Sequence, residues 1–261
     1  MPVKKEERKD FIKFLGTAGA RFVMIRQLRA SGGLWVSYKG TNVLVDPGPG
    51  SIVRCAASKP KLDPCRLDGI ILTHRHLDHS GDINVMIEAM TEGGFKKKGI
   101  VFCPADTLDQ DQVILKYEIS SLEKLEILEA NKDYKVGNLE FQTSPRHIHS
   151  VETYGLKFKM KNKVISYLVD TRYAGELVDF YKGTDILIIC VVFFEPRGGI
   201  DHLSLQDVET LIEEIRPGKV ILTHFGMTML KAKPHIQAEN LSRRLNIEVV
   251  SAYDGMTVDC S

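Results

Sequence analysis

Six consecutive residues bring together the side chains best suited to binding a metal ion. In the run His-Arg-His-Leu-Asp-His, His74, His76 and His79 supply imidazoles, and Asp78 supplies a carboxylate. Both groups are good ligands for a borderline divalent metal such as zinc. A polar turn with surface histidines is the ordinary alternative. Four ligand-type residues in six make metal binding the better interpretation.

The residues before this cluster predict how it is positioned. Residues 69–73 form a nearly unbroken apolar run, which is typical of a strand buried on both faces. If that strand ends at residue 73, His74 and His76 project to the same side. The turn over residues 77–79 then brings Asp78 and the third imidazole beside them. One short loop could therefore supply ligands to two adjacent ions.

Elsewhere the chain alternates between strand and helix signals. Alternating or continuous apolar runs bounded by turn residues predict strands over residues 11–15, 34–38, 42–46, 69–73, 100–103, 139–142, 156–160, 164–169 and 220–223. One helix is expected over residues 83–90, and a second should start at a Ser204 cap and end at Pro217-Gly218. The apolar face of the second helix would consist of Val208, Leu211, Ile212 and Ile215. Two sheets packed face to face with helices outside, in an α/β fold, are the simplest arrangement.

Composition and chain organisation set the broad class. No linker divides the chain, so residues 11–261 are expected to form a single domain behind a charged leader, residues 1–10. The 35 basic and 34 acidic residues nearly cancel, which leaves no whole-molecule field to gather a long polyanion. No signal peptide or membrane-spanning run is apparent, and the five scattered cysteines show no disulfide spacing. These features favour a cytoplasmic protein without a membrane partner.

The His-x-His-x-Asp-His pattern resembles that of the metallo-β-lactamase superfamily, and the resemblance extends across most of the chain. In that family, later segments supply a His, an Asp after a strand and a His after another strand. The matching positions here are His149, Asp170 and His224. The resemblance implies a four-layer αββα sandwich, in which two mixed sheets are flanked by helices.

The resemblance also implies how the ligands are shared between two ions. The first ion would be held by His74, His76 and His149, and the second by Asp78, His79 and His224, with Asp170 bridging them. A bridging carboxylate makes chemical sense because two cations about 3.5–4 Å apart repel each other. A water between them, with its pKa lowered to about 7, becomes a hydroxide nucleophile. Asp78 could both bind metal and orient that hydroxide.

Two points about the ligand set remain open in the sequence. His147 would point the same way as His149 on an extended strand, although the spacing to Gly155 favours His149. His147 would then lie behind the ligands or at the surface. Two zinc ions fit the histidine count, while mixed nitrogen and oxygen ligands also suit manganese or iron.

Further segments resemble one branch of the superfamily, that of ribonuclease Z and the cyclic phosphodiesterases (PhnP-like). These segments are residues 14–19, 29–31, 46–48 and 149–155. His202, in Asp-His-Leu-Ser, lies 22 positions before His224. In the resembling phosphodiesterases, a His in this segment faces the scissile phosphate. His202 is therefore expected to act as a general acid or phosphate clamp.

The spacing between two of the ligands bears on the substrate. Only 20 residues separate His149 from Asp170, where ribonuclease Z proteins carry a long tRNA-binding arm. This favours a small or cyclic phosphodiester over nucleic acid. The alternatives are an RNA-processing nuclease of ribonuclease Z type and a thioesterase or lactonase. A non-catalytic RNA-binding relative is disfavoured, because all seven candidate ligands are present. A homodimer is compatible with the sequence.

The remaining candidate residues have ordinary explanations. Glu195 could reach the cleft and pair with His202, but a solvated loop explains it equally well. His235 lies outside every motif and is expected at the surface. The cysteines are expected to be buried small apolar residues.

Overall fold

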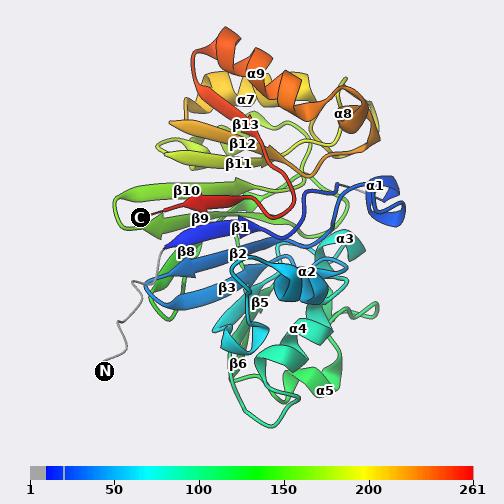
Figure 1. Ribbon diagram of the computed structural model, residues 1–261, viewed down its shortest axis with the longest axis vertical. Helices are drawn as coiled ribbons and strands as arrows, with labels where there is room; N and C mark the ends of the chain where they lie inside the picture. Colours follow the sequence, from blue (N-terminus) through cyan, green and yellow to red (C-terminus); the bar gives the residue numbers. More distant parts are fainter. Residues whose placement is uncertain (1–9, 20, 261) are drawn as a thin grey trace.

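The strands of the two halves assemble into two seven-stranded sheets that pack face to face, with helices on the outer faces (Figure 1). The computed structural model describes residues 10–19 and 21–260. Two mixed sheets flanked by helices are the α/β architecture that the resemblance implied.

The first sheet comes mainly from the amino-terminal half and has the order β14-β1-β2-β3-β4-β5-β6. Its strands are β1 (Phe11–Phe14), β2 (Leu34–Tyr38), β3 (Thr41–Val45), β4 (Gly69–Ile71), β5 (Ile100–Cys103), β6 (Lys124–Ile127) and β14 (Thr257–Asp259). Neighbours are antiparallel from β14 to β3 and parallel from β3 to β6. β2 and β3 form a hairpin, and both turn residues, Lys39 (φ 46°) and Gly40 (φ 83°), have the positive φ of a tight hairpin turn.

The second sheet repeats this pattern in the order β13-β12-β11-β10-β9-β8-β7. Its strands are β7 (Asp133–Val136), β8 (Leu139–Arg146), β9 (Tyr154–Met160), β10 (Lys163–Leu168), β11 (Ile186–Cys190), β12 (Lys219–Thr223) and β13 (Glu248–Ser251). Neighbours are antiparallel from β7 to β10 and parallel from β10 to β13. Each sheet therefore consists of an antiparallel half followed by a parallel half.

Helices cover the outer face of each sheet (Figure 1). The α-helices are α1 (Phe22–Ile25), α2 (Ser51–Ala57), α3 (Leu77–Ser80), α4 (Ile83–Met90), α5 (Lys116–Ile119), α6 (Val178–Tyr181), α7 (Leu205–Ile215), α8 (Met227–Lys231) and α9 (Pro234–Leu245). Short 3-10 helices are η1 (Pro64–Arg66), η2 (Ala105–Leu108) and η3 (Gly175–Leu177). The prediction for α7 is confirmed: Ser204 and Asp207 form a capping box, and the four expected apolar residues are buried.

Three apolar clusters hold the layers together. The central one lies between the sheets and includes Val36, Phe141, Phe158 and Ile188. The other two pack α7 and α9 on the second sheet, and α2 and α4 on the first. Because both faces of each sheet are covered, polar side chains gather where the strands end. In such α/β sheets, the carboxyl ends of parallel strands are the usual place for a binding site.

The first and last strands of the described chain pair at the edge of the first sheet. β14 pairs with β1, and the amide of Cys260 donates to the carbonyl oxygen of Asp10 over 2.9 Å. Asp10 is buried, and its carboxylate accepts a hydrogen bond from the amide of Lys39. The rest of the expected leader, residues 1–9, lies outside the described residues. Over residues 10–19 and 21–260, no helix has the length and apolar character needed to cross a bilayer.

Candidate metal centre

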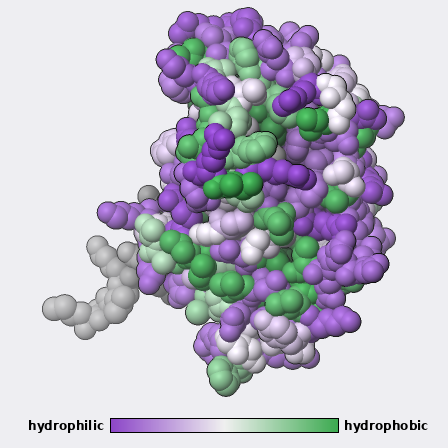
Figure 2. All heavy atoms as spheres, turned by 90° about the vertical axis from the view of Figure 1, so that its right-hand side faces the viewer, coloured by the Kyte–Doolittle hydropathy of each residue, from purple (hydrophilic) through white to green (hydrophobic). Residues whose placement is uncertain are grey.

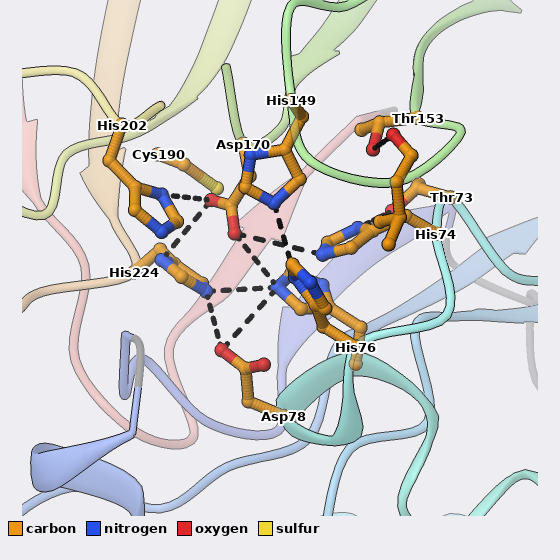
Figure 3. Close-up of polar contacts among 12 residues, drawn as sticks. Thr73, His74, His76, Asp78, His149, Thr153, Asp170, Cys190, His202 and His224 are labelled. Carbon is orange, nitrogen blue, oxygen red and sulfur yellow. Dashed lines mark hydrogen bonds and ion pairs between the residues drawn. The ribbon is translucent and has the colours of Figure 1, made fainter. Parts of the chain in front are cut away.

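Histidine and aspartate side chains from both sheets converge at the carboxyl ends of β4, β10 and β12 (Figure 3). All seven side chains predicted as ligands are brought together there. Their donor atoms form two groups, and within each group every atom lies within 4.8 Å of the others. The groups are His74, His76 and His149, and Asp78, His79, Asp170 and His224.

Hydrogen bonding fixes the tautomer in the first group. Nδ1 of His149 lies 2.9 Å from the carbonyl oxygen of Asp201, so it carries a proton, and Nε2 is left with a lone pair. That Nε2 lies only 3.1 Å from Nδ1 of His76. Burial lowers the pKa of His76 to about 4, so its ring is neutral near pH 7. Two imidazole nitrogens in this arrangement are suited to sharing one cation.

The second group also brings potential metal-binding atoms of different side chains close together. Nδ1 of His79 lies 3.0 Å from Oδ2 of Asp46 and 2.9 Å separates Nε2 of His79 from Nε2 of His224. Oδ2 of Asp78 lies 3.3 Å from Nε2 of His224 and 3.8 Å from Nε2 of His79. His224 adopts a left-handed backbone (φ 59°) directly after β12, an unusual conformation for a residue other than glycine. Three donor atoms therefore face one another across a few ångströms.

Asp170 lies between the two groups. Its Oδ2 is 3.4 Å from Nε2 of His79 and 3.8 Å from Nε2 of His74, so one oxygen faces a histidine of each group. The side chain is buried. Burial acts to raise the pKa of Asp170, but His224 and His202 beside it hold the pKa well below its usual value. A carboxylate that stays ionised at this position can hold two cations close together.

The buried polar atoms of the cluster fit metal ions better than a hydrogen-bond network. Within the described ranges, Nε2 of His74, Oδ2 of Asp78, Oδ1 of Asp170 and Nδ1 of His224 are buried without a hydrogen-bond partner. Buried polar groups in folded proteins are nearly always satisfied. Facing lone pairs on imidazoles about 3 Å apart repel unless a cation lies between them. The donor set is therefore that of a divalent metal site.

Residues 41–225 match the beta-lactamase superfamily domain, and this range contains every residue of the two groups. The chain belongs to this superfamily. It is 30% identical to an uncharacterized protein of Methanocaldococcus jannaschii over 256 aligned residues. The alignment covers 95% of this chain and 94% of that protein.

Solved structures agree on the fold. The metallo-beta-lactamase fold protein YhfI from Bacillus subtilis aligns with a TM-score of 0.79 at 19% identity, covering 96% of this chain and 99% of YhfI. A diphosphatase of the PhnP family aligns with a TM-score of 0.71 at 20% identity, and the alignment covers 97% of this chain and 99% of the diphosphatase. The chain is thus a hydrolase of the metallo-β-lactamase superfamily, and its fold implies divalent metal ions.

Asp46 lies in a segment that the resemblance included, residues 46–48, but the sequence assigned it no role at the site. It is buried, and it follows β3 with a left-handed backbone (φ 54°). Its Oδ2 accepts a hydrogen bond of 2.8 Å from Oγ1 of Thr73, and that hydroxyl lies 3.1 Å from Nδ1 of His74. The same Oδ2 faces Nδ1 of His79. One carboxylate therefore orients a histidine of each group and leaves each Nε2 free to bind metal.

Replacing this carboxylate should weaken metal binding. In Asp46→Asn, an amide nitrogen in place of Oδ2 cannot accept, so the hydroxyl of Thr73 and Nδ1 of His79 both lose their acceptor, and a histidine can turn or change tautomer. With the amide turned the other way, the backbone amide of Thr73 loses its acceptor. We expect metal affinity to fall about 10- to 100-fold, as for other residues that orient metal-binding histidines. Competition with a chromophoric chelator measures this. Asp109→Asn, at an exposed position, is the control, and equal affinities for the two variants would show that Asp46 does not orient the ligands.

His147 and His149 do not point the same way, because β8 ends one residue before His147. His147 is buried, with Nδ1 3.1 Å from the carbonyl oxygen of Asp170 and Nε2 2.9 Å from the hydroxyl of Tyr181. A Cβ at Gly155 would lie 1.8 Å from that hydroxyl oxygen, so the contact needs glycine there. Both nitrogens of His147 are engaged behind Asp170, so of the two positions expected for this residue, behind the ligands or at the surface, the structure shows the first.

This buried histidine should make stability depend on pH. Burial lowers the pKa of His147 to about 4, whereas an unfolded histidine titrates near about 6.5. The unfolded chain takes up the proton first, so the stabilisation is fully present above about pH 6.5 and falls as the pH drops toward about 4, by up to about 3 kcal/mol. His147→Gln keeps a donor and an acceptor but does not titrate. Urea unfolding from about pH 7 to about pH 4.5 should show a shallower decline for this variant, and equal slopes would contradict the assignment.

His202 borders the cluster from the loop before α7 (Figure 3). Its Nδ1 lies 3.7 Å from Oδ1 of Asp170, and its ring packs edge-on against those of His149 and Phe193. With His149 and Asp170 it forms a third set of donor atoms within 4.8 Å. Burial acts to lower the pKa of His202, but Asp170 raises it above its usual value. The imidazole can therefore hold a proton beside the two groups.

The other candidates lie apart from the centre. Glu195 is exposed in the loop after β11, and His235 is exposed on α9, as expected. All five cysteines are free thiols. Four of them are buried as predicted, but Cys65 is exposed on η1, so the prediction is wrong for that residue.

Proposed function

We propose that this hydrolase is a dinuclear phosphodiesterase acting on small or cyclic phosphodiesters, with zinc as its metal. The observation that carries the proposal is His202 beside Asp170. A phosphodiester needs a proton at its leaving oxygen, and a raised imidazole pKa suits that task. Hydrolysis of an activated thioester or lactone depends less on a proton donor at the leaving group.

Each residue has a distinct role in the proposed reaction. His74, His76 and His149 would hold one ion, and Asp78, His79 and His224 the other, with Asp170 between them. When bound, the two ions would lower the pKa of a water toward about 7 and draw charge from a phosphoryl oxygen. Asp78 would orient the attacking water. Nδ1 of His202 faces Asp170, so Nε2 would give its proton to the leaving oxygen.

Two features support a small substrate. The stretch between His149 and Asp170 is occupied mainly by β9 and β10, which leaves no length for an RNA-binding arm. The face that carries α1 and α3 mixes hydrophobic with hydrophilic side chains (Figure 2). Phe22 and Ile25 of α1 and Leu77 of α3 are all more than half exposed. Arg21 and Arg26 flank α1, but this partly apolar face does not present the continuous row of cations that binds a polyphosphate backbone well.

A substrate panel tests the proposal. The metal-reconstituted protein would be assayed with bis-p-nitrophenyl phosphate, a cyclic nucleotide, precursor tRNA, a thioester and a lactone, and its metal content measured in parallel. We expect about two ions per chain and turnover of the first two substrates. Turnover of the thioester or lactone with no phosphodiester cleavage under any metal would overturn the proposal. Cleavage of precursor tRNA alone would favour the nuclease alternative.

A further inference from the structure

A second cavity lies outside the metal centre, on the outer face of the first sheet. It opens between β1, the end of α2 and the turn before β14, and encloses about 570 Å³ including its mouth. None of the residues proposed to bind metal lines it. Its charged lining consists of Lys13, Arg54, Lys59 and Asp254. Three cations against one carboxylate are unusual in a chain whose charges nearly cancel.

Among the residues that the structure describes, the cations of this cavity have no acidic partner. Lys13 is only 5% exposed, yet within residues 10–19 and 21–260 no carboxylate oxygen lies within 4.0 Å of Lys13, Arg54 or Lys59. Buried lysines in folded proteins are rarely left without a countercharge. An anion in the cavity would supply it.

Hydrogen-bond donors are left over at the same place. Nζ of Lys13 donates to the carbonyl oxygen of Lys59 and to Oγ1 of Thr257, both at 3.1 Å, so one of its three donors is free. Nε of Arg54 donates to the carbonyl oxygen of Leu15 over 3.0 Å, which leaves the outer guanidinium nitrogens. Oγ of Ser58 is buried and has no partner among the described residues.

The single carboxylate does not neutralise these groups. Oδ1 of Asp254 accepts from Oγ1 of Thr17 and Oδ2 accepts from the amide of Ala30, each over 2.7 Å. Both oxygens of Asp254 are therefore engaged with the segment between β1 and β2. The remaining donors of the cavity have no hydrogen-bond acceptor in the described part of the chain.

We propose that this cavity binds a phosphate group, either as inorganic phosphate or as part of a small phosphate monoester. A phosphate dianion has enough acceptor oxygens for the guanidinium of Arg54, the ammonium of Lys13 and the hydroxyl of Ser58 together. The volume accommodates a monoester as well as the free ion. The site does not depend on the reaction at the metal centre.

Amide chemical shifts can test this site separately from the metal centre. The metal-loaded, ¹⁵N-labelled protein would be titrated with inorganic phosphate and, separately, with glycerol phosphate. We expect shifts of the Lys13, Ser58 and Gly255 amides. Equal affinities would identify the phosphate group alone as the ligand, whereas about tenfold tighter binding of glycerol phosphate would identify a monoester. Shifts confined to residues around His74 and His224 would overturn the proposal.

Matched variants complete the test. Lys13→Met replaces the ammonium with an apolar chain of similar length, and should weaken binding at this site at least about tenfold, as expected for a lost charge-assisted hydrogen bond. Arg54→Gln retains a donor for Leu15 and should have a similar effect. Lys61→Met, which alters an exposed lysine lining a different pocket, is the control. If all three variants bind phosphate as the unaltered protein does, the cavity is not an anion site.

Discussion

Asp170→Asn should reduce the metal content from about two ions per chain to one or fewer, and lower turnover at least about a thousandfold, equivalent to about 4 kcal/mol. The reason is geometric. One oxygen of Asp170 lies within 3.8 Å of Nε2 of a histidine in each group, so this carboxylate supplies the negative charge between them. An amide has similar size and removes that charge. Metal analysis after reconstitution, together with steady-state kinetics, measures both effects.

A matched control distinguishes the loss of the charge of Asp170 from an unspecific effect of an Asp-to-Asn substitution. Asp179→Asn makes the same change on α6, where the side chain is 85% exposed, and should leave metal content and turnover unaltered. If Asp170→Asn still binds two ions per chain, the proposed bridging position is wrong. The unfolding transition of the metal-free variant should remain cooperative, because the substitution preserves volume.

His202→Ala should retain both ions yet lose about 10²- to 10⁴-fold in turnover of a cyclic nucleotide, the range typical of a lost general acid. The loss should depend on the leaving group. p-Nitrophenolate is a weak base and leaves without a proton, so bis-p-nitrophenyl phosphate should be affected much less. Comparison of kcat for the two substrates in the same variant measures that difference.

The alternative roles of His202 predict other outcomes. A metal ligand would give low metal content in His202→Ala, and a phosphate clamp would give equal losses for both substrates, mainly in KM. His235→Ala, at an exposed position on α9, controls for the loss of an imidazole. Unchanged kinetics in His202→Ala would remove the observation on which the phosphodiesterase proposal rests.

Features that depend on residues close together in the sequence could be predicted, whereas features that depend on distant residues could not. The cluster from His74 to His79 is local, and the Ser204 cap carries a short-range signal and is found where it was predicted. Strand ends were less well predicted, since the strand before the cluster ends at Ile71 and not at residue 73. Asp46 acts through its contacts with Thr73 and His79, which lie 27 and 33 positions further along the chain. Nothing in the Asp-Pro-Gly turn indicates these contacts. An acidic residue directly after a buried strand, as at Asp170, was the one available signal.

The sequence was least informative where a short segment changes direction. His147 and His149 were expected on one side of an extended strand, but the chain leaves β8 just before them. His147 therefore contacts the backbone carbonyl of Asp170, whereas His149 faces His76. The pairing of β14 with β1 joins the first strand to the last, and only tertiary packing determines it. Three residues of β14 carry too little periodicity to announce a strand.

The two groups of donor atoms draw on both sheets: the loop after β4 supplies part of each, and the segments after β8, β10 and β12 supply the rest. Ions bound there would act as a further cross-link between two halves that are joined by apolar packing and by hydrogen bonds such as that from the amide of Phe225 to the carbonyl oxygen of Thr17. Binding free energy then becomes free energy of unfolding, about 4 kcal/mol when free metal exceeds its dissociation constant a thousandfold. A cell starved of metal would therefore hold a form that opens more often, and proteases would remove it faster than the loaded form.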